Sequence, residues 1–220
     1  MIWVENIETY GFDTAVRAMR NPMSSWNKSD SCFAMHGFET GDFVIGMDDM
    51  ELMQKLIRAG VEHRTFMRMM QVSMDITAPL YWWKEMDRYC VGKSQISTST
   101  MHTIHKREFT MDDFSHDHLS EHGTATLQAL IADLNIARNE YIGTKNKQAW
   151  WDMIQLLPTS YNQKRTILMS YEVVMKIIRE RRGHRLDEWR DLIVILLDLP
   201  YMKDLVAAMD GGGKYIEAGN

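Results

Sequence analysis

Residues 70–89, which read MQVSMDITAPLYWWKEMDRY, decide how the chain folds. Apolar and polar residues alternate over the first eight positions, and the apolar set is Met70, Val72, Met74 and Ile76. A period of two is typical of a strand that buries one face. We therefore expect a strand over residues 70–77, which Ala78-Pro79 ends. The following YWWKEMDRY predicts a short helix or turn that leaves the strand.

Outside this stretch, the apolar spacing is mainly that of helices. Apolar residues recur three and four positions apart in five segments, 48–59, 124–141, 147–157, 170–182 and 186–199. In the first segment Asp48 is placed to cap the helix, with Glu51 three residues further on, and Gly60 is expected to end it.

The order of these elements, with a further strand near 43–46, indicates an α+β fold. We expect a single, mostly helical domain with a small antiparallel or mixed sheet over residues 1–209. The glycine-rich residues 210–220 predict a flexible tail. The run 192–197 is apolar on every side, so it should be buried or pack against a neighbouring subunit.

The composition is that of an ordinary globular protein, with 220 residues, 45% hydrophobic and 25% charged. No apolar run is long enough to predict a membrane span, and the N-terminus lacks the pattern of a signal peptide. Two cysteines, Cys32 and Cys90, make no disulfide framework and suggest a reducing compartment, the cytoplasm. The formal net charge of −5 argues against a nucleic-acid binder.

Nineteen methionines and seven tryptophans are an unusual share of the chain. Thioether side chains adapt to irregular gaps, so we expect the methionines to fill the core. An aromatic-lined cleft for a planar ligand is the alternative that such a composition leaves open.

Four segments place polar residues where a binding site could lie. The first is Glu62-His63-Arg64, between a helix and the strand. The second is the run 80–102, in which Arg88 and a hydroxyl-rich loop could hold a phosphate. The alternatives are a solvated turn for the first segment and a plain polar loop, with both tryptophans in the core, for the second.

The other two segments are rich in basic residues. Residues 157–166 bring Gln163, Lys164 and Arg165 in front of a helix, whose N-terminus could also attract an anion. Residues 179–191 read RERRGHRLDEWRD. The alternative for 157–166 is a basic turn on the surface, and the alternative for 179–191 is a solvated basic helix junction, offset by Glu180, Asp187 and Glu188.

The sequence contains neither a metal-binding pattern nor one of the common nucleotide-binding motifs. The histidines of the middle of the chain have no ligand spacing typical of zinc, so we expect no metal: His102, His105, His116, His118 and His122. The chain has no glycine-rich dinucleotide motif, no P-loop and no G-x-S-x-G.

Taken together, the polar segments resemble the flavin-dependent thymidylate synthases over residues 50–195. Glu62-His63 precedes the strand as an FEH-like turn does in that family, and the strand ends in Ala78-Pro79 as the family's does. The family signature R-H-R-x-x-S-x-N-E-x-S-x-R falls on residues 88–100, where Arg88 is the one residue strictly kept. Tyr89 stands at the histidine position, which puts the identity of the substrate in question.

The resemblance continues in the second half of the chain. Leu157-Pro158 and Arg165 are similar to an LP turn followed by an arginine. The family's H-A-Q-x-E-I-R stretch falls on HRLDEWR, where His184, Glu188 and Arg190 match.

The resemblance implies an activity and an assembly. Members of the family are homotetramers with FAD at each subunit junction, and they use NADPH to reduce it. They pass a methylene group from methylenetetrahydrofolate to carbon 5 of dUMP, which gives dTMP. The partners implied are therefore a pyrimidine deoxynucleotide and a folate, with no nucleic acid and no membrane.

The resemblance also implies roles for particular residues. Arg190 would be catalytic, because a cation at a pyrimidine carbonyl stabilises charge that develops on the ring. The nucleotide would be bound by Glu85, Arg88, Ser99, Thr100, Arg165 and Arg190. The flavin would be held by His63, Arg88, Tyr89, Gln95, Ser97, Arg181 and His184.

Three alternatives stay open. The chain could be a related flavoenzyme that modifies another pyrimidine nucleotide, which the altered signature motivates. It could also be a catalytically inert relative that binds a nucleotide or a protein partner. A helical nucleic-acid binder that uses the arginines of 179–190 conflicts with the net charge.

Overall fold

The computed structural model describes residues 1–36 and 39–209, so the tail predicted over 210–220 lies outside the described residues. The helices and strands in chain order are β1 Trp3–Tyr10, α1 Phe12–Met19, η1 Asn21–Met23, η2 Trp26–Lys28, β2 Cys32–His36, β3 Glu39–Val44, α2 Met47–Ala59, η3 Thr65–Arg68, β4 Gln71–Pro79, α3 Leu80–Met86, β5 Lys93–Ser97, α4 Thr100–Thr103, η4 Met111–Asp113, α5 Glu121–Thr144, α6 Lys147–Gln155, β6 Asn162–Ser170, α7 Tyr171–Arg181, α8 Asp187–Leu197 and α9 Met202–Met209.

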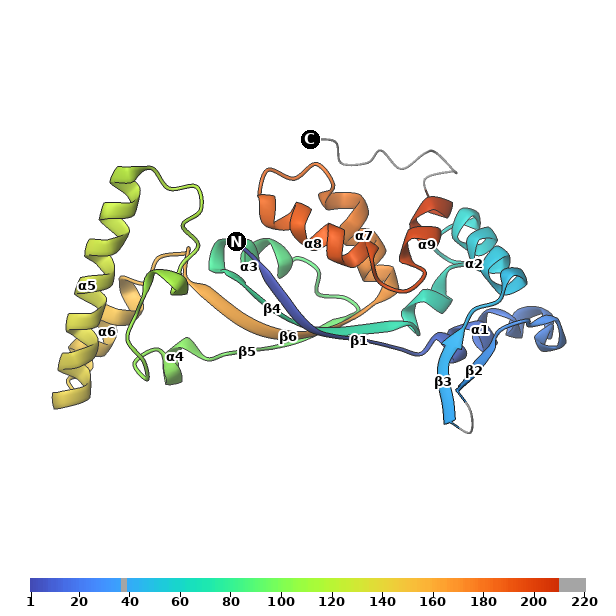
Figure 1. Ribbon diagram of the computed structural model, residues 1–220, viewed down its shortest axis with the longest axis horizontal. Helices are drawn as coiled ribbons and strands as arrows, with labels where there is room; N and C mark the ends of the chain where they lie inside the picture. The colour runs from blue at the N-terminus through green and yellow to red at the C-terminus, as the bar shows by residue number, and fades with distance from the viewer. Residues whose placement is uncertain (37–38, 210–220) are drawn as a thin grey trace.

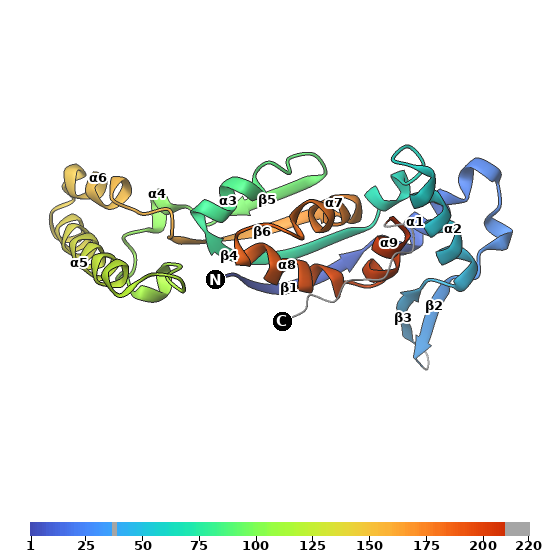
Figure 2. The same cartoon turned by 90° about the horizontal axis from the view of Figure 1, so that it is seen from above.

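A four-stranded antiparallel sheet in the order β1-β4-β6-β5 runs through the middle of the molecule. The two inner strands, β4 and β6, pair from Gln71 with Ser170 to Pro79 with Asn162. Helices α3, α7, α8 and α9 lie on one face, and none of the described helices lies over the middle of the other face (Figures 1 and 2). The α+β prediction, with mostly helical structure and a small antiparallel sheet, is confirmed.

Strand β4 confirms the alternating run that the sequence predicted. Val72, Met74, Ile76 and Ala78 are buried beneath the helices, whereas the residues between them are half-buried on the open face. The strand continues to Pro79 and α3 begins at the next residue. A proline is tolerated there because β1 pairs with β4 only as far as Thr77, so Pro79 has a strand neighbour on one side only.

The five predicted helices are present as α2, α5, α6, α7 and α8. The predicted cap of α2 was wrong, because the N-cap is Gly46 and not Asp48. The backbone N–H groups of Asp48 and Asp49 donate instead to the carboxylate of Asp30, at 2.9 and 3.1 Å. Gly60 follows the last helical residue with φ of 127°, which confirms the predicted stop.

Two segments expected as a loop and a turn are strands. Residues 93–97 form the edge strand β5, and residues 162–170 form β6. Gln163 and Arg165 occupy helix-facing positions of β6, since they pair with Ala78 and Ile76 of β4, and so they break the apolar alternation. Both strands therefore depend on pairing with their neighbours, and neither has a regular alternation of apolar and polar residues that would predict a strand.

Two separate cores stabilise the fold. The main core lies between the sheet and its helices and confirms the expected role of the methionines, with Met53, Met67, Met70, Met74, Met86, Met169, Met175 and Met202 buried. A smaller core joins α5 to α6, which form an arm at one end of the molecule (Figure 1).

The apolar run of α8 faces the main core on one side only. Leu192, Ile193 and Leu196 are buried, whereas Val194 is 55% exposed. Part of the run is therefore buried as predicted. No helix in the described ranges is long and apolar enough to cross a membrane.

Candidate functional site

The end of α3 lies beside the end of α7, and this junction brings several predicted site residues together. α3 ends at Met86, so Glu85 belongs to its last turn and Arg88 and Tyr89 follow it directly. Their common partner is Arg181, the last residue of α7. The tertiary fold thus joins two of the polar segments seen in the sequence.

Arg181 is 11% exposed and is held by three side chains. Its Nε donates to the hydroxyl of Tyr89 at 2.9 Å, and its Nη2 lies 3.1 Å from the Glu85 carboxylate. The guanidinium lies over the ring of Trp189, 4.8 Å from the centroid. Among residues 1–36 and 39–209, its Nη1 has no hydrogen-bond partner.

A cavity of about 340 Å³ opens beside Arg181. We call it the α3–α7 cavity, and it is lined by Arg88, Tyr89, Lys176, Glu180 and Arg181. Three cations and one carboxylate face it, so its lining is positive although the chain has a net charge of −5. The volume falls within the range of small-molecule sites.

Tyr89 connects the arginine to the acidic side of the cavity. Its hydroxyl accepts from Arg181 and donates to Glu180 at 3.1 Å. Burial is the main cause that raises the pKa of Tyr89, and the hydrogen bond and charge of Arg181 partly offset it. The phenol therefore stays protonated at neutral pH and keeps its bond to Glu180.

Three buried tryptophans form a row, one end of which lies beneath Arg181. Trp82 contacts both Trp83 and Trp189, with ring centroids 4.8 Å apart in each pair, and all three rings are fully buried. Arg181 covers Trp189 at one end of this row, and Arg165 covers Trp83 at the other, 4.2 Å from the ring centroid. Trp82 and Trp83 therefore belong to the core and support the site from below.

Arg165, predicted to bind the nucleotide phosphate, already has protein partners. Its Nη1 donates to Asp87 at 2.8 Å, and its Nε donates to Gln163 at 3.0 Å. The Asp87 carboxylate also accepts from Gln95, at 2.8 Å. Arg165 and Gln95 thus lie together beside the end of α3, and both contact the same carboxylate.

Lys93 completes this second group. Its side chain is only 3% exposed, and its ammonium donates to the Met86 carbonyl and to the Gln95 side chain at 3.1 and 3.0 Å. Burial lowers the pKa of Lys93, partly offset by the charge of Asp87. These bonds tie the start of β5 to the end of α3.

The predicted hydroxyl donors lie at the far end of β5. Ser97 pairs with Arg165 across the β5–β6 ladder, and Ser99 caps α4 by accepting from the N–H of His102. Thr100 is the first residue of α4. A second cavity of about 400 Å³ lies nearby, lined by Thr77, Thr98, Thr103, Ile104, Lys106, Arg107, Glu108, Phe109, Asp113, Tyr161, Asn162 and Lys164.

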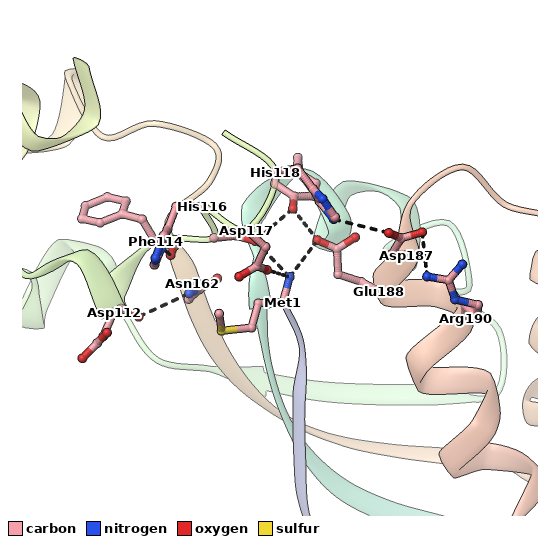
Figure 3. A network of polar contacts seen from close by, with 12 residues as sticks. Met1, Asp112, Phe114, His116, Asp117, His118, Asn162, Asp187, Glu188 and Arg190 are labelled. Carbon is pink, nitrogen blue, oxygen red and sulfur yellow. Dashed lines mark hydrogen bonds and ion pairs between the residues drawn. The ribbon is translucent and has the colours of Figure 1, made fainter. Parts of the chain in front are cut away.

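Arg190, predicted to be the catalytic residue, lies in a different setting (Figure 3). It is 62% exposed and pairs with Asp187 at 3.0 Å, and the other oxygen of Asp187 lies 3.3 Å from His118. Arg190 and Arg181 share no partner among the described contacts. The structure therefore does not bring Arg190 into the α3–α7 cavity.

The carboxylate of Glu188, two residues before Arg190 in sequence, is buried in the same region. It accepts from the Tyr81 hydroxyl and lies 3.2 Å from the Met1 amino group (Figure 3). The pKa of Tyr81 is raised to about 12, mainly by burial and then by the bond to Glu188. These contacts fix the first turn of α8, from which Trp189 extends under Arg181.

The two histidines predicted to contact the flavin lie apart from each other. His63 is 53% exposed in the turn before η3, and its nearest charged partner is Glu62 at 3.9 Å. His184 lies close to the site, because its ring is 6.1 Å from that of Trp189, and its Nδ1 accepts from the N–H of Leu186.

Sequence reasoning missed Lys176, Glu180 and Trp189 as members of the site. Lys176 and Glu180 are four residues apart on a predicted helix, so they share a face, and this spacing was an available signal. Trp189 had none, because its role depends on Arg181 lying over it. In the part of the chain that the structure describes, no group of three or more histidine, cysteine, aspartate or glutamate side chains could hold a metal ion.

The sequence matches no protein-family model and no curated protein. The structure, however, is similar to solved structures. A flavin-dependent thymidylate synthase from Helicobacter pylori, complexed with FAD and dUMP, has a TM-score of 0.62 at 17% identity, over 92% of this chain and 97% of that one. A second structure, thymidylate synthase X from Helicobacter pylori with FAD and dUMP, has a TM-score of 0.65 at 18% identity, over 95% and 99%.

These likenesses cover nearly the whole of each chain. They bear out, at the level of the fold, the resemblance that the polar segments indicated. The protein therefore has the fold of the flavin-dependent thymidylate synthases.

Proposed function

We propose that the chain is a flavin-dependent thymidylate synthase, which converts dUMP to dTMP with methylenetetrahydrofolate, FAD and NADPH. The observation that carries the proposal is Arg181, which lines the α3–α7 cavity while its guanidinium is held by Tyr89 and Glu85 and lies over the ring of Trp189. The fold supports it, because two solved structures with this fold hold FAD and dUMP.

The residues of the α3–α7 cavity suit a ring with carbonyl groups, as in a pyrimidine or a flavin. Arg181 offers a charged donor, and Trp189, Tyr89 and Glu85 restrict how its guanidinium can turn. Arg88 and Lys176 would add positive charge at the rim. FAD, when bound, would supply the hydride chemistry that the side chains lack.

Arg181 is the residue that we propose polarises the pyrimidine. A guanidinium that is already oriented stabilises negative charge on a carbonyl oxygen without reorganising first. Tyr89 would hold Arg181 in place through a protonated phenol, and Glu85 would fix its other side. Arg190 remains a prediction from the resemblance, and it is the alternative candidate for this role.

We also propose that the active form is a homotetramer. A cavity of about 340 Å³ accommodates one ring system and its substituents, so FAD and dUMP together would need further surface. A second copy of the chain could supply it. The open face of the sheet suits such an interface, because it carries the exposed apolar side chains of Trp3, Tyr10, Ile96 and Leu168.

The first experiment is the visible absorbance spectrum of the purified chain, before and after addition of FAD. Bound flavin gives bands in the visible range, and turnover of dUMP against dCMP then separates a thymidylate synthase from a flavoenzyme with another pyrimidine substrate. A colourless protein that takes up no added FAD would exclude both enzymes and leave the inert relative.

A further inference from the structure

The carboxylate of Glu85 lies between two arginines of the α3–α7 cavity. One oxygen, Oε2, is 3.1 Å from Nη2 of Arg181 and 3.4 Å from Nη1 of Arg88. Glu85 is 33% exposed and Arg88 is 71% exposed, so solvent and ligands reach this group. A single protein carboxylate is thus shared by two guanidinium groups.

This sharing weakens the cavity as a phosphate site. Arginine holds a phosphate best when two parallel N–H groups donate to two oxygens of the same anion. Here Nη1 of Arg88 donates to Glu85, Nη2 of Arg181 forms an ion pair with the same carboxylate, and the Nε of Arg181 is used by Tyr89. A phosphate that approached either guanidinium would also meet the negative charge of Glu85 at short range.

The remaining charges of the cavity do not restore a strong anion site. Glu180 adds a second negative charge, next to Tyr89 and 3.7 Å from Arg179. Lys176 is the one other cation of the lining, and its ammonium lies 5.7 Å from the centre of the Tyr89 ring. The positive charge of the lining is therefore partly cancelled by Glu85 where Arg88 and Arg181 meet, and by Glu180 beside Tyr89.

We propose that Glu85 determines the ligand specificity of the α3–α7 cavity. Its carboxylate keeps phosphate and other dianions away from Arg88 and Arg181, and it leaves Nη1 of Arg181 to an uncharged carbonyl group. This inference deepens the proposed function and rests on it for the identity of that group, the carbonyl of a pyrimidine or flavin ring. The phosphate of a nucleotide would then bind outside this cavity.

The test is the affinity of the full chain for inorganic phosphate at neutral pH, measured by calorimetry in low salt. Glu85→Gln keeps the size and polarity of the side chain and removes its charge. We expect this variant to bind phosphate about tenfold more tightly than the unchanged chain, because a unit charge a few ångströms away is removed. The gain should shrink as salt is added.

Asp133→Asn is the matched control, because Asp133 is an exposed carboxylate of α5. It changes the net charge by the same amount, away from the cavity, and should leave phosphate affinity unchanged. In the Glu85→Gln background, Arg88→Gln should return the affinity to near its starting value. Circular dichroism spectra and melting temperatures establish that each variant is folded.

Two results would overturn the proposal. One is a Glu85→Gln variant that is folded and binds phosphate no more tightly than the unchanged chain. The other is an equal gain in Asp133→Asn, which would be an effect of net charge alone. Neither result depends on flavin binding, so the absorbance test of the proposed function can fail while this inference stands, and the reverse holds too.

Discussion

The guanidinium of Arg181 lies 4.8 Å from the ring centroid of Trp189, whose own Nε1 is buried without a hydrogen-bond partner in the described ranges. Trp83, under Arg165, differs in one respect, because its Nε1 donates to the carbonyl oxygen of Gln163 at 2.9 Å. Two buried indoles thus support two arginines, and only the second is also tied to the backbone of β6.

This difference predicts unequal costs for the same substitution. Trp189→Phe should lower the free energy of unfolding by about 1–2 kcal/mol through lost volume, because no hydrogen bond is broken. Trp83→Phe should cost about 1 kcal/mol more, because the carbonyl of Gln163 loses its donor. Urea denaturation of both variants measures the difference, and equal costs would mean that the bond to Gln163 contributes nothing.

The two candidate arginines can be separated by kinetics. Arg181→Lys should lower kcat for dUMP methylation by about 100-fold, because lysine cannot reproduce a guanidinium held by Glu85 and Tyr89. Arg190→Lys should change kcat by less than about twofold, because Arg190 is exposed and pairs with Asp187. Steady-state measurement of kcat and KM for both variants decides which arginine is catalytic. A larger loss of kcat in Arg190→Lys than in Arg181→Lys would return the catalytic role to Arg190.

The cap of α2 gives a test of a contact distant in sequence. Asp30→Ala should destabilise the protein by about 1 kcal/mol, because the N–H groups of Asp48 and Asp49 lose their acceptor. Asp48→Ala is the control, because its own side chain does not cap the helix. Thermal or urea unfolding measures the stability of the two variants. A larger loss of stability in Asp48→Ala than in Asp30→Ala would contradict the assignment of the cap.

Asp75 predicts how stability depends on acid. Hydrogen bonds from Thr166 and Asn6, followed by the contact with Lys164, lower the pKa of its carboxyl from 3.8 to about 2. Because the folded pKa is the lower one, the stabilisation is fully present above about pH 4 and is lost as the pH falls towards 2.

The Asp75→Asn variant should therefore lose less stability than the unchanged chain when the pH is lowered from 5 to 2. The urea midpoint at each pH is the measurement, and Asp198→Asn, at an exposed carboxylate paired with Lys203, is the control. If the unchanged chain and Asp75→Asn had parallel acid profiles, the bonds to Asp75 would not be the cause.

Part of the site could be predicted because the residues that carry the resemblance lie close together in the sequence. Glu85, Arg88 and Tyr89 lie within five consecutive residues at the end of α3, so their order in the sequence places them together. Arg181 and His184 fall in the same basic segment. What this segment could not reveal is which arginine faces the cavity, since that depends on where α7 ends and how α8 leaves it.

The sequence by itself determined the strand 70–77 and the five long helices, because the period of two or 3.6 is a property of each segment alone. It also determined that methionines would fill the core. Only the tertiary structure decided that residues 93–97 and 162–170 are strands, because their polar side chains give no period and pairing with a neighbour holds them.

The tertiary structure alone likewise decided the chemistry of the site. Arg181 meets Tyr89 across 92 positions of sequence, and Asp30 caps a helix that begins well after it. Such contacts leave no local pattern, because they depend on the distance between folded elements and not on the spacing of residues along the chain. For the same reason, only the fold shows that Glu85 neutralises two arginines at once.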